Sequence, residues 1–391
     1  MTENCGKVQI DRSRYQAEPV FGEPIPDKMM LEDIKRYRKD GLQEVIKERK
    51  SYNYLFYLSE LRKNIIEWYP FFRQAEVLAV GADAGILTDA LAQKAAHVTC
   101  VETSETRAEM NAAWNAEKDN VRIILGNYPE VEDKLGSYDY ITLIGEWKYA
   151  RSYYEKSEDA YRTFLLELLK HLKTGGELLL ATENKMGMKY WAGCQEDYYG
   201  GYYRGIEDYP GEDNVRTFSK KELEEELRGI EGISWKFYYP YPDYKFPMTI
   251  HSDRHLPASG ELHMRDYNFD RLRLDLFQES QVYNTLLSND LYPQFANSFL
   301  LVIGKEQPQT APVYVKFSNE RDQKLSIYTE ISEAADGQLT VKKVPSQKKA
   351  AAHVRNLGTI CEELTGMYKE EEIEVNRCRI KGDCAQLEYL T

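Results

Sequence analysis

Residues 76–102 read EVLAVGADAGILTDALAQKAAHVTCVE and predict the centre of the fold. Four apolar residues at 77–80 are typical of a buried strand, and a helical segment and a second apolar strand follow. The turn at 81–85 carries glycines that let the backbone approach a ligand, and the helix behind it presents free N–H groups. Glu102, at the end of the second strand, can accept hydrogen bonds from both ribose hydroxyls. This pattern predicts a nucleoside-binding site.

The turn itself indicates which cofactor it suits. Dinucleotide sites use G-x-G-x-x-G, because the pyrophosphate presses against the start of the helix. Here the turn reads G-A-D-A-G, with Asp83 where an anionic pyrophosphate would lie. An acidic turn suits a cation or a zwitterion, and S-adenosylmethionine (SAM) carries a sulfonium and an ammonium group. The alternative is a strand, turn and helix that bind no ligand.

At these residues the chain resembles the class I SAM-dependent methyltransferases, whose first motif is an acidic strand end followed by G-x-G-x-G. Two positions depart from that motif, because Ala79 replaces the acid and Asp83 replaces the middle glycine. The resemblance implies S-adenosyl-L-methionine as the cofactor and S-adenosylhomocysteine as its product. We expect Asp83 to contact the ammonium group.

Composition limits the class of protein. A chain of 391 residues predicts two or three domains, and 42% hydrophobic with 29% charged residues is typical of a soluble globular protein. We find no run of about 18 apolar residues and no signal peptide, so we expect no transmembrane segment and a cytoplasmic location. The net charge of −13 argues against nucleic acid as a partner. The six scattered cysteines indicate reduced thiols, and no metal site is expected.

Strand and helix patterns alternate along the chain after residue 72. Further strands are predicted at VRIIL, YDYITLI and ELLLA, with helices between them. Such alternation predicts an α/β, Rossmann-like, doubly wound parallel sheet, in which ligands lie at the carboxyl ends of the strands. The ends at 81–85, Glu102, Asn127 and 145–146 should therefore converge. Two helices before the first strand offer lid candidates in Tyr57, Ser59 and Arg62.

The methyltransferase resemblance implies roles for these strand ends. Glu102 takes the ribose, and Asn127 accepts a hydrogen bond from the adenine amino group through its side-chain carbonyl. The cofactor-binding residues that it implies are Tyr57, Gly81, Ala82, Asp83, Gly85, Glu102, Thr103, Asn127 and Gly145.

A tyrosine-rich loop follows the predicted strand ELLLA and runs from 181 to the capping-box sequence at 219–222. It combines glycine hinges, aromatic rings and charged tips at the expected mouth of the crevice, so it is the natural acceptor-binding element. Aromatic faces stack on sugars and phenol hydroxyls bond sugar hydroxyls. The same composition would also suit a protein interface.

The phrases ENKMGMKYWAGCQED, GIEDYP, VRTFSKKEL and YPYPDYKFP resemble, in this order, bacterial methyltransferases found with surface-polysaccharide and glycosyltransferase genes. The resemblance covers roughly residues 50 to 305. Some of those relatives, the O-antigen chain terminators, join a methyltransferase to a kinase and methylate a phosphate on the glycan end. One position departs from the family, because Lys148 replaces an acid after the fourth strand.

The acceptor decides which residues are needed. A sugar hydroxyl requires a general base, for which Glu146 and Glu183 are the candidates, whereas a glycan-linked phosphate requires cationic clamps. The clamp candidates are Lys185, Lys189, Arg204 and Arg216. From these sets we predict Glu146, Glu183 and Lys189 as catalytic.

The C-terminal sequence changes to strands, one helix and further strands. This succession resembles the N-lobe of a protein kinase, with Lys342 or Lys343 at the phosphate-binding lysine position. We find no glycine-rich loop, H-R-D or D-F-G sequence. We therefore expect a truncated longer protein, or alternatively a small α+β accessory domain.

Three domains are expected. They are an N-terminal arm and helical lid at 1–72, a methyltransferase domain at 73–305, and an α+β domain at 306–391. Residues 1–26 should form the arm, and an insertion at 240–297 should carry helices such as RLRLDLF and QVYNTLLSNDL. The predicted function is methyl transfer to a glycan hydroxyl or glycan-linked phosphate, with a possible glycosyltransferase or kinase partner domain. The alternatives are a non-catalytic SAM-binding scaffold and a platform for a kinase.

Overall fold

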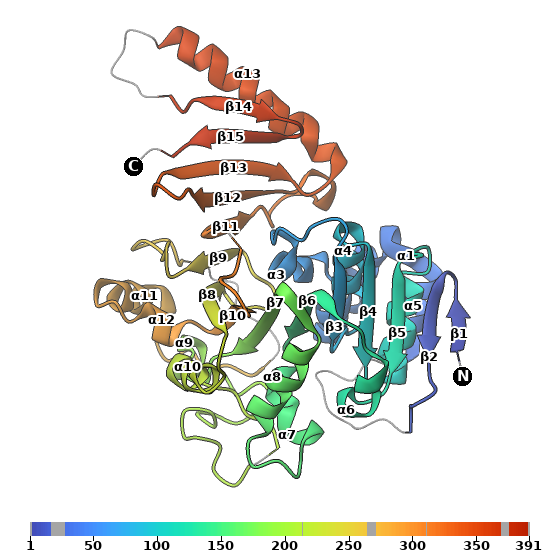
Figure 1. Cartoon of the computed structure of the whole chain (residues 1–391). Helices are drawn as coiled ribbons and strands as arrows, with labels where there is room; N and C mark the ends of the chain where they lie inside the picture. The colour runs from blue at the N-terminus through green and yellow to red at the C-terminus, as the bar shows by residue number, and fades with distance from the viewer. Residues whose placement is uncertain are drawn as a thin grey trace.

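The computed structural model describes residues 2–16, 28–212, 214–263, 271–309, 311–368 and 375–389. Its strands form one mixed sheet in the order β1-β2-β5-β4-β3-β6-β7-β10-β8-β9-β11-β12-β13-β15-β14. The chain thus builds one continuous sheet from its N-terminal hairpin to its C-terminal strands, as Figure 1 shows.

The central strands have the doubly wound arrangement that the sequence predicts. The parallel strands are β3 (Glu76–Val80), β4 (His97–Glu102), β5 (Val121–Leu125), β6 (Tyr138–Ile144) and β7 (Leu172–Glu183). β10 (Ser298–Gly304) lies antiparallel between β7 and β8 (Ser234–Tyr241). Strand order therefore reverses at β3, which places the ligand crevice outside the carboxyl ends of β3 and β6. The predicted α/β, Rossmann-like, doubly wound fold is confirmed.

Alternate residues of β3 supply the two cores of this sheet. Val77 and Ala79 join the core that includes α1 (Lys28–Arg49), α4 (Ile86–Lys94) and α5 (Glu105–Trp114). Leu78 and Val80 join the core that includes α8 (Ala160–Lys170) and α10 (Lys220–Arg228). A strand that is apolar at every position is therefore buried on both faces. The capping box at Ser219 and Glu222 opens α10 as predicted.

Shorter elements connect these layers. They are α2 (Tyr52–Leu58), η1 (Glu60–Lys63), α3 (Asn64–Glu67), α6 (Tyr128–Val131), η2 (Glu132–Lys134), η3 (Trp147–Tyr149), α7 (Ala150–Tyr153) and α9 (Met188–Trp191). The second helix expected before β3 is thus divided into α2, η1 and α3.

The N-terminal residues differ from the expected arm. β1 (Thr2–Cys5) and β2 (Val8–Asp11) form an antiparallel hairpin, and β2 pairs in parallel with β5. Val8 and Ile10 are buried beneath α5, which explains why this polar segment is ordered as strands. Residues 17–27 lie outside the described residues.

The insertion contains β9 (Thr249–Ser252), α11 (Glu279–Ser288) and α12 (Tyr292–Phe295). The helix expected at QVYNTLL is confirmed as α11. The helix expected at RLRLDLF is wrong, because residues 271–277 form no helix and Arg273 forms an isolated antiparallel bridge with Cys194. The alternation of arginine and leucine has the two-residue period of a strand, and the leucines face outward.

The C-terminal strands continue the main sheet. β11 (Tyr314–Phe317) pairs with β9, and β12 (Ile327–Glu333), β13 (Leu339–Pro345), β15 (Cys384–Glu388) and β14 (Cys378–Lys381) follow in that order. The 3₁₀ turns η4 (Gln323–Leu325) and η5 (Lys348–Ala350) precede β12 and α13 (Ala351–Met367). Val354 of α13 packs on Ile327 and Ala385 of the sheet. The expected succession of strands, helix and strands is present.

We predict that the Phe317→Ala substitution lowers the free energy of unfolding by about 3–5 kcal/mol. Phe317 is 4% exposed and belongs to the same apolar core as β3, although it lies on β11. Urea denaturation followed by circular dichroism measures the loss, and the whole chain should unfold in one transition. Leu325→Ala is the control, because Leu325 is 48% exposed and its loss should cost less than about 0.5 kcal/mol. Separate melting of the C-terminal strands would contradict the shared core.

Candidate active site

The turn after β3 is shaped by a carboxylate that lies against it. Gly81 has φ +69°, and a Cβ placed there would lie 2.6 Å from Oε2 of Glu146. Asp83 also takes a left-handed backbone conformation, with φ +51°, which aspartate tolerates better than most residues. Glycine at position 81 therefore allows the end of β6 to close on the end of β3.

Glu102 joins the tip of β4 to this turn. Its Oε2 accepts a hydrogen bond from the backbone N–H of Asp83 at 3.0 Å. Its Oε1 accepts from the N–H groups of Thr103 and Ser104 at 2.9 and 3.0 Å, and from Nε of Arg107 at 2.8 Å. Because a carboxylate offers about four acceptor positions, Oε2 retains capacity for another donor. Glu102 is 1% exposed, and burial raises its pKa while Arg107 opposes the rise.

The helices before β3 cover this turn. Arg62 of η1 is buried over the ring of Phe56, with 3.8 Å from its guanidinium carbon to the ring centroid. Its Nη2 forms an ion pair with Oδ2 of Asp83 at 2.8 Å, whereas the buried Nη1 has no hydrogen-bond acceptor among the described residues. Tyr57 of α2 is 1% exposed and lies close to Arg107. Two of the lid candidates thus face the turn.

Glu146, beside the turn, is a carboxylate whose proton affinity fits acid–base chemistry. Burial raises its pKa to about 7, while Arg107 and the hydroxyl of Tyr153, which donates to Oε1, oppose the rise. Glu102 and Asp83 add like charge nearby. A carboxyl group with a pKa near neutrality can take up and release protons at physiological pH.

A cavity of about 600 Å³ opens beside these residues. It lies between the end of β5 and α7, and its lining includes Asn127, Glu130, Tyr153 and Tyr154. The side-chain nitrogen of Asn127 lies 3.3 Å from Oε1 of Glu130. Its buried Oδ1 has no hydrogen-bond donor within the described part of the chain. An unpartnered acceptor therefore lies at the position where the sequence predicts contact with adenine.

Glu183, at the end of β7, belongs to a second buried cluster. Its Oε1 forms an ion pair with Nζ of Lys148 at 2.8 Å and accepts from the hydroxyl of Tyr244 at 2.9 Å. The other oxygen, Oε2, is buried without a donor among the described residues. Lys148 lowers the pKa of Glu183 against the effect of burial. Glu183 is therefore held as a carboxylate.

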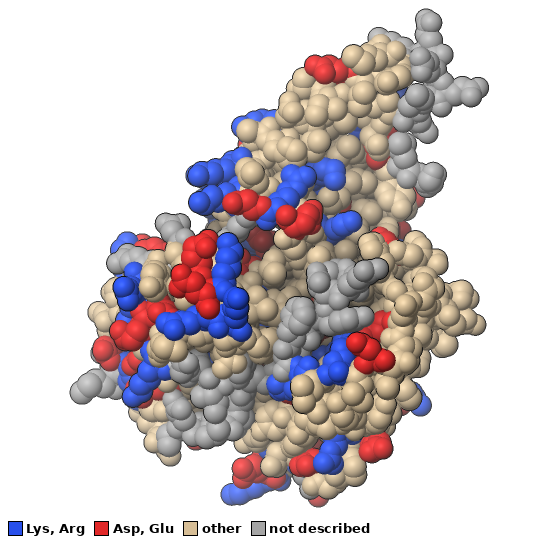
Figure 2. Space-filling model, turned by 180° about the vertical axis from the view of Figure 1, so that it is seen from behind, with Lys and Arg blue, Asp and Glu red and all other residues tan. Residues whose placement is uncertain are grey.

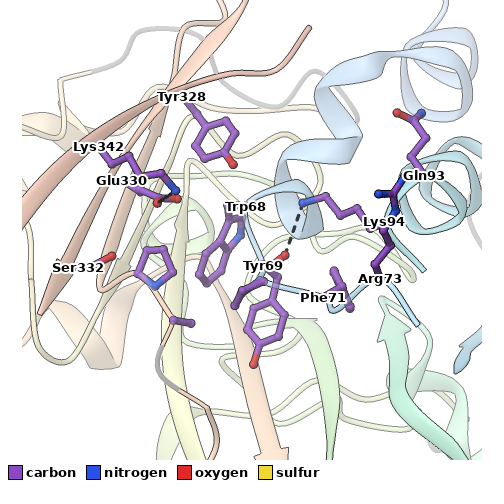
Figure 3. A pocket seen from close by; sticks show the side chains of 13 residues that line it. Trp68, Tyr69, Phe71, Arg73, Gln93, Lys94, Tyr328, Glu330, Ser332 and Lys342 are labelled. Atoms are coloured by element: carbon purple, nitrogen blue, oxygen red, sulfur yellow. Dashed lines mark hydrogen bonds and ion pairs between the residues drawn. The ribbon is translucent and has the colours of Figure 1, made fainter. Parts of the chain in front are cut away.

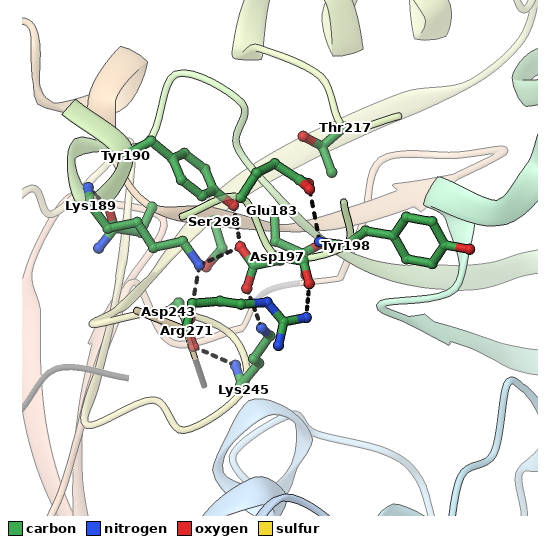
Figure 4. Close-up of polar contacts among 12 residues, drawn as sticks. Glu183, Lys189, Tyr190, Asp197, Tyr198, Thr217, Asp243, Lys245, Arg271 and Ser298 are labelled. Carbon is green, nitrogen blue, oxygen red and sulfur yellow. Dashed lines mark hydrogen bonds and ion pairs between the residues drawn. The ribbon is translucent and has the colours of Figure 1, made fainter. Parts of the chain in front are cut away.

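Asp197 of the tyrosine-rich loop lies at the centre of the same cluster (Figure 4). It forms ion pairs with Lys189 at 2.8 Å and with Lys245, and it accepts from the hydroxyl of Tyr190. Lys189 is 2% exposed. Lys189 is therefore engaged with a buried carboxylate, in contrast to the exposed anion clamp that the sequence suggests.

The two clusters meet at the end of β6. Gly145 has φ +78°, and a Cβ at this position would lie 2.6 Å from the hydroxyl oxygen of Tyr244. Tyr244 thus contacts both Gly145 and Glu183, while the next residue, Glu146, contacts Gly81. The structure brings together Gly81, Asp83, Glu102, Thr103, Gly145 and Glu146, and joins Glu183 to them through Tyr244. Ala82 is buried within the turn, and Gly85 caps α4 with φ +102°.

Sequence reasoning missed several partners of these residues. They are Arg107, Tyr153, Asp197, Tyr244 and Lys245. A signal for Arg107 exists, because Ser104 caps α5 and places Arg107 in its first turn, just after Glu102. Tyr244 and Lys245 lie in the phrase YPYPDYKFP, which was recognised without a role for either residue.

No family model matches the chain, and no curated protein matches it. Solved structures with similarity include DhpI in complex with SAH, at 15% identity and a TM-score of 0.33 over 54% of this chain and 92% of that chain. They also include the plantazolicin methyltransferase BamL with a triazolic desmethylPZN analogue and SAH. It has 13% identity and a TM-score of 0.38 over 71% of this chain and 98% of that chain. A third is phosphoethanolamine N-methyltransferase 1 of Haemonchus contortus, at 16% identity and a TM-score of 0.36 over 65% of this chain and 54% of that chain. These TM-scores are below 0.5, so the fold is assigned from strand order and register.

We predict that Lys148→Met destabilises the protein by about 3–5 kcal/mol, because it leaves the carboxylate of Glu183 buried without its cation. The double variant Lys148→Met/Glu183→Gln should recover most of that loss, since the uncompensated charge is gone. Urea denaturation of the four members of this cycle measures the coupling. Lys170→Met, which removes an exposed partner of Glu167, should cost less than about 1 kcal/mol. Equal losses in single and double variants would contradict the pairing.

Proposed function

We propose that this chain is a SAM-dependent methyltransferase that transfers a methyl group to a hydroxyl of a glycan. The observation that carries the proposal is the convergence of the 81–85 turn, Glu102 and Glu146 at one edge of the sheet. The turn and Glu102 form a nucleoside site, and Glu146 adds a carboxylate that can accept a proton. No other described cluster combines these two properties.

Polar atoms around the turn that can still form a hydrogen bond fit this cofactor. Oε2 of Glu102 can accept from the ribose hydroxyls, and Oδ1 of Asn127 can accept from the adenine amino group. Nη1 of Arg62 is available to the carboxylate of the methionine part, and Asp83 beside it suits the ammonium group. Tyr57, Ala82, Thr103 and Gly145 complete the proposed binding surface.

SAM supplies a methyl group that its sulfonium already activates. The residues of the chain then have to orient the acceptor and remove its proton, because proximity and alignment supply most of the acceleration in such a displacement. Glu146 accepts the proton of the acceptor hydroxyl, and Tyr153 holds its carboxylate in place. Glu183 acts as a positioning residue. It accepts a hydrogen bond from Tyr244, and Tyr244 in turn lies against Gly145.

The tyrosine-rich loop supports a glycan as the acceptor. Tyr149, Tyr198, Tyr199 and Tyr209 follow one another at centroid distances of 5.7, 4.9 and 6.1 Å. This row begins in η3, next to Glu146, and Tyr198 and Tyr199 are partly exposed. Partly exposed rings can stack on the C–H faces of sugars while their hydroxyls form hydrogen bonds.

The cations of the loop favour a hydroxyl over a phosphate. Lys185 and Arg216 each form ion pairs with both Asp208 and Glu222, and Lys189 is paired with Asp197. A phosphate would have to displace these carboxylates before it could be clamped. Arg204 lies 3.5 Å from the carbonyl oxygen of Pro210.

The proposed setting is bacterial surface-polysaccharide synthesis in the cytoplasm. The described helices include none that is long and apolar enough to cross a bilayer. On the face in Figure 2, acidic and basic side chains lie interspersed among the described residues, which suits a soluble glycan better than a nucleic-acid backbone. The C-terminal strands and α13 are proposed as a kinase N-lobe-like unit, supported by the succession of three strands, a helix and two strands.

Calorimetric titration with SAM and S-adenosylhomocysteine tests the cofactor site. We expect micromolar binding that Glu102→Ala weakens about 100-fold, because a ribose hydrogen bond to a buried carboxylate is lost. Asn127→Leu should weaken binding about tenfold while the fold is kept. Glu76→Ala, which removes an acid from the opposite end of β3, is the matched control and should bind normally. Absence of binding to the unaltered chain would overturn the proposal, and binding without transfer to any glycan would favour a scaffold.

We predict that Glu146→Gln lowers the methyl-transfer rate by about 10²–10⁴-fold and removes a rise in rate through pH 7. The same substitution should make the protein more stable at pH 8. The pKa of Glu146 is raised from 4.5 to about 7 in the folded protein, so stability is full below pH 4.5 and falls as pH rises towards 7. The unaltered protein should lose about 3 kcal/mol over this interval. Urea denaturation at pH 5 and pH 8 measures this loss of stability. A Glu146→Gln variant with the same pH dependence as the unaltered protein would contradict the raised pKa of Glu146.

A further inference from the structure

A second cavity, of about 560 Å³, lies where the main sheet meets the C-terminal strands. Figure 3 shows side chains of the segment before β3 and of α4 on one side, and side chains of β12 and β13 on the other. The cavity adjoins Arg73, which precedes the start of β3, and Lys94 at the end of α4. It therefore lies at the opposite edge of the sheet from Glu102 and Glu146.

Lys94 is the most informative residue of this cavity. Its ammonium group donates to the main-chain carbonyls of Glu67 and Tyr69. No carboxylate lies within ion-pair distance of it among the described residues. Burial lowers the pKa of Lys94, while the nearby carboxylates of Glu67 and Glu330 oppose the change. Lys94 is partly buried and only carbonyl oxygens contact its ammonium group, so an arriving anion would add a direct ion pair.

Two further cations line the same space. Arg73 is exposed, and the described residues provide no acidic partner for it. Lys342 of β13 forms an ion pair with Glu330 of β12 at 2.9 Å. The lining thus contains three cations against one carboxylate, although the whole chain carries a net charge of −13. This local excess of positive charge is the reverse of the overall charge.

The remaining wall suits a ring. Phe71, Pro312 and Tyr328 give the wall an apolar part. Ser332 and Gln93 add hydrogen-bonding groups between the charged and the apolar parts. A ligand that combines an anionic group with a flat or saturated ring would satisfy both parts of the wall.

We propose that this cavity is a binding site for a small phosphorylated ring compound, with Arg73 and Lys94 binding the phosphate group. Sugar phosphates and nucleotides share this chemistry, and a volume of about 560 Å³ accommodates either. The site is independent of methyl transfer, because none of its lining residues belongs to the proposed cofactor site. Its ligand contacts residues from both parts of the sheet.

Calorimetric titration of the full chain with glucose 1-phosphate, UDP and inorganic phosphate tests the site. Arg73→Gln and Lys94→Gln should each weaken binding of the preferred probe about tenfold or more, since each removes a charge-assisted hydrogen bond. Glu330→Gln should strengthen binding, because it removes the only carboxylate of the lining and releases Lys342. Lys170→Gln, a distant exposed lysine, is the matched control and should leave binding unchanged. Tighter binding of glucose 1-phosphate or of UDP identifies the source of the phosphate.

Three results would overturn the proposal. They are the absence of binding by any probe at millimolar concentration, equal effects of Arg73→Gln and Lys170→Gln, and weaker binding in Glu330→Gln. Arg73 is exposed, so Arg73→Gln tests the site even where Lys94→Gln fails to fold. SAM titration of the same samples separates this test from the proposed function, because Glu102→Ala should leave phosphate binding unchanged.

Discussion

The buried carboxylate of Glu102 is the interaction on which the crevice depends. It holds the tip of β4, the turn after β3 and the first turn of α5 together through four hydrogen bonds. A buried charge is tolerated only when it is paired and bonded, and Arg107 together with three backbone N–H groups meets that condition. The turn is thereby fixed before any ligand binds, so little conformational entropy has to be lost on binding.

The fold could be predicted because its signals are local and repeated. Strands that are apolar at every position, with helices between them, allow few arrangements other than a doubly wound sheet. The N-terminal hairpin was missed, because strands of four residues carry too little pattern to be distinguished from a polar arm. The segment 271–277 was expected to be a helix, although its alternation already had the period of a strand.

The candidate site was predictable only in part, for a different physical reason. Topology alone places Gly81, Glu102 and Glu146 at one edge, since the carboxyl ends of parallel strands share that edge. The partners that set their charge come from distant segments, as Tyr244 does for Glu183 across 61 positions. Whether a lysine clamps an anion or neutralises a buried aspartate depends on such contacts. The sequence around Lys189 therefore does not indicate that Lys189 forms an ion pair with Asp197.

The continuity of the sheet gives the two proposed sites a physical relation. β9 and β11 join the main sheet to the C-terminal strands, and Phe317 shares a core with β3. The crevice lies at the carboxyl end of β3 and the cavity lies at its amino end, so one rigid strand separates them. A ligand in the cavity would tie Arg73 and Lys94 to β12 and β13, which strengthens the junction without touching the crevice. Such a ligand would stabilise the fold by its own binding free energy, whereas any effect on methyl transfer would require two arrangements of the sheet that differ in affinity.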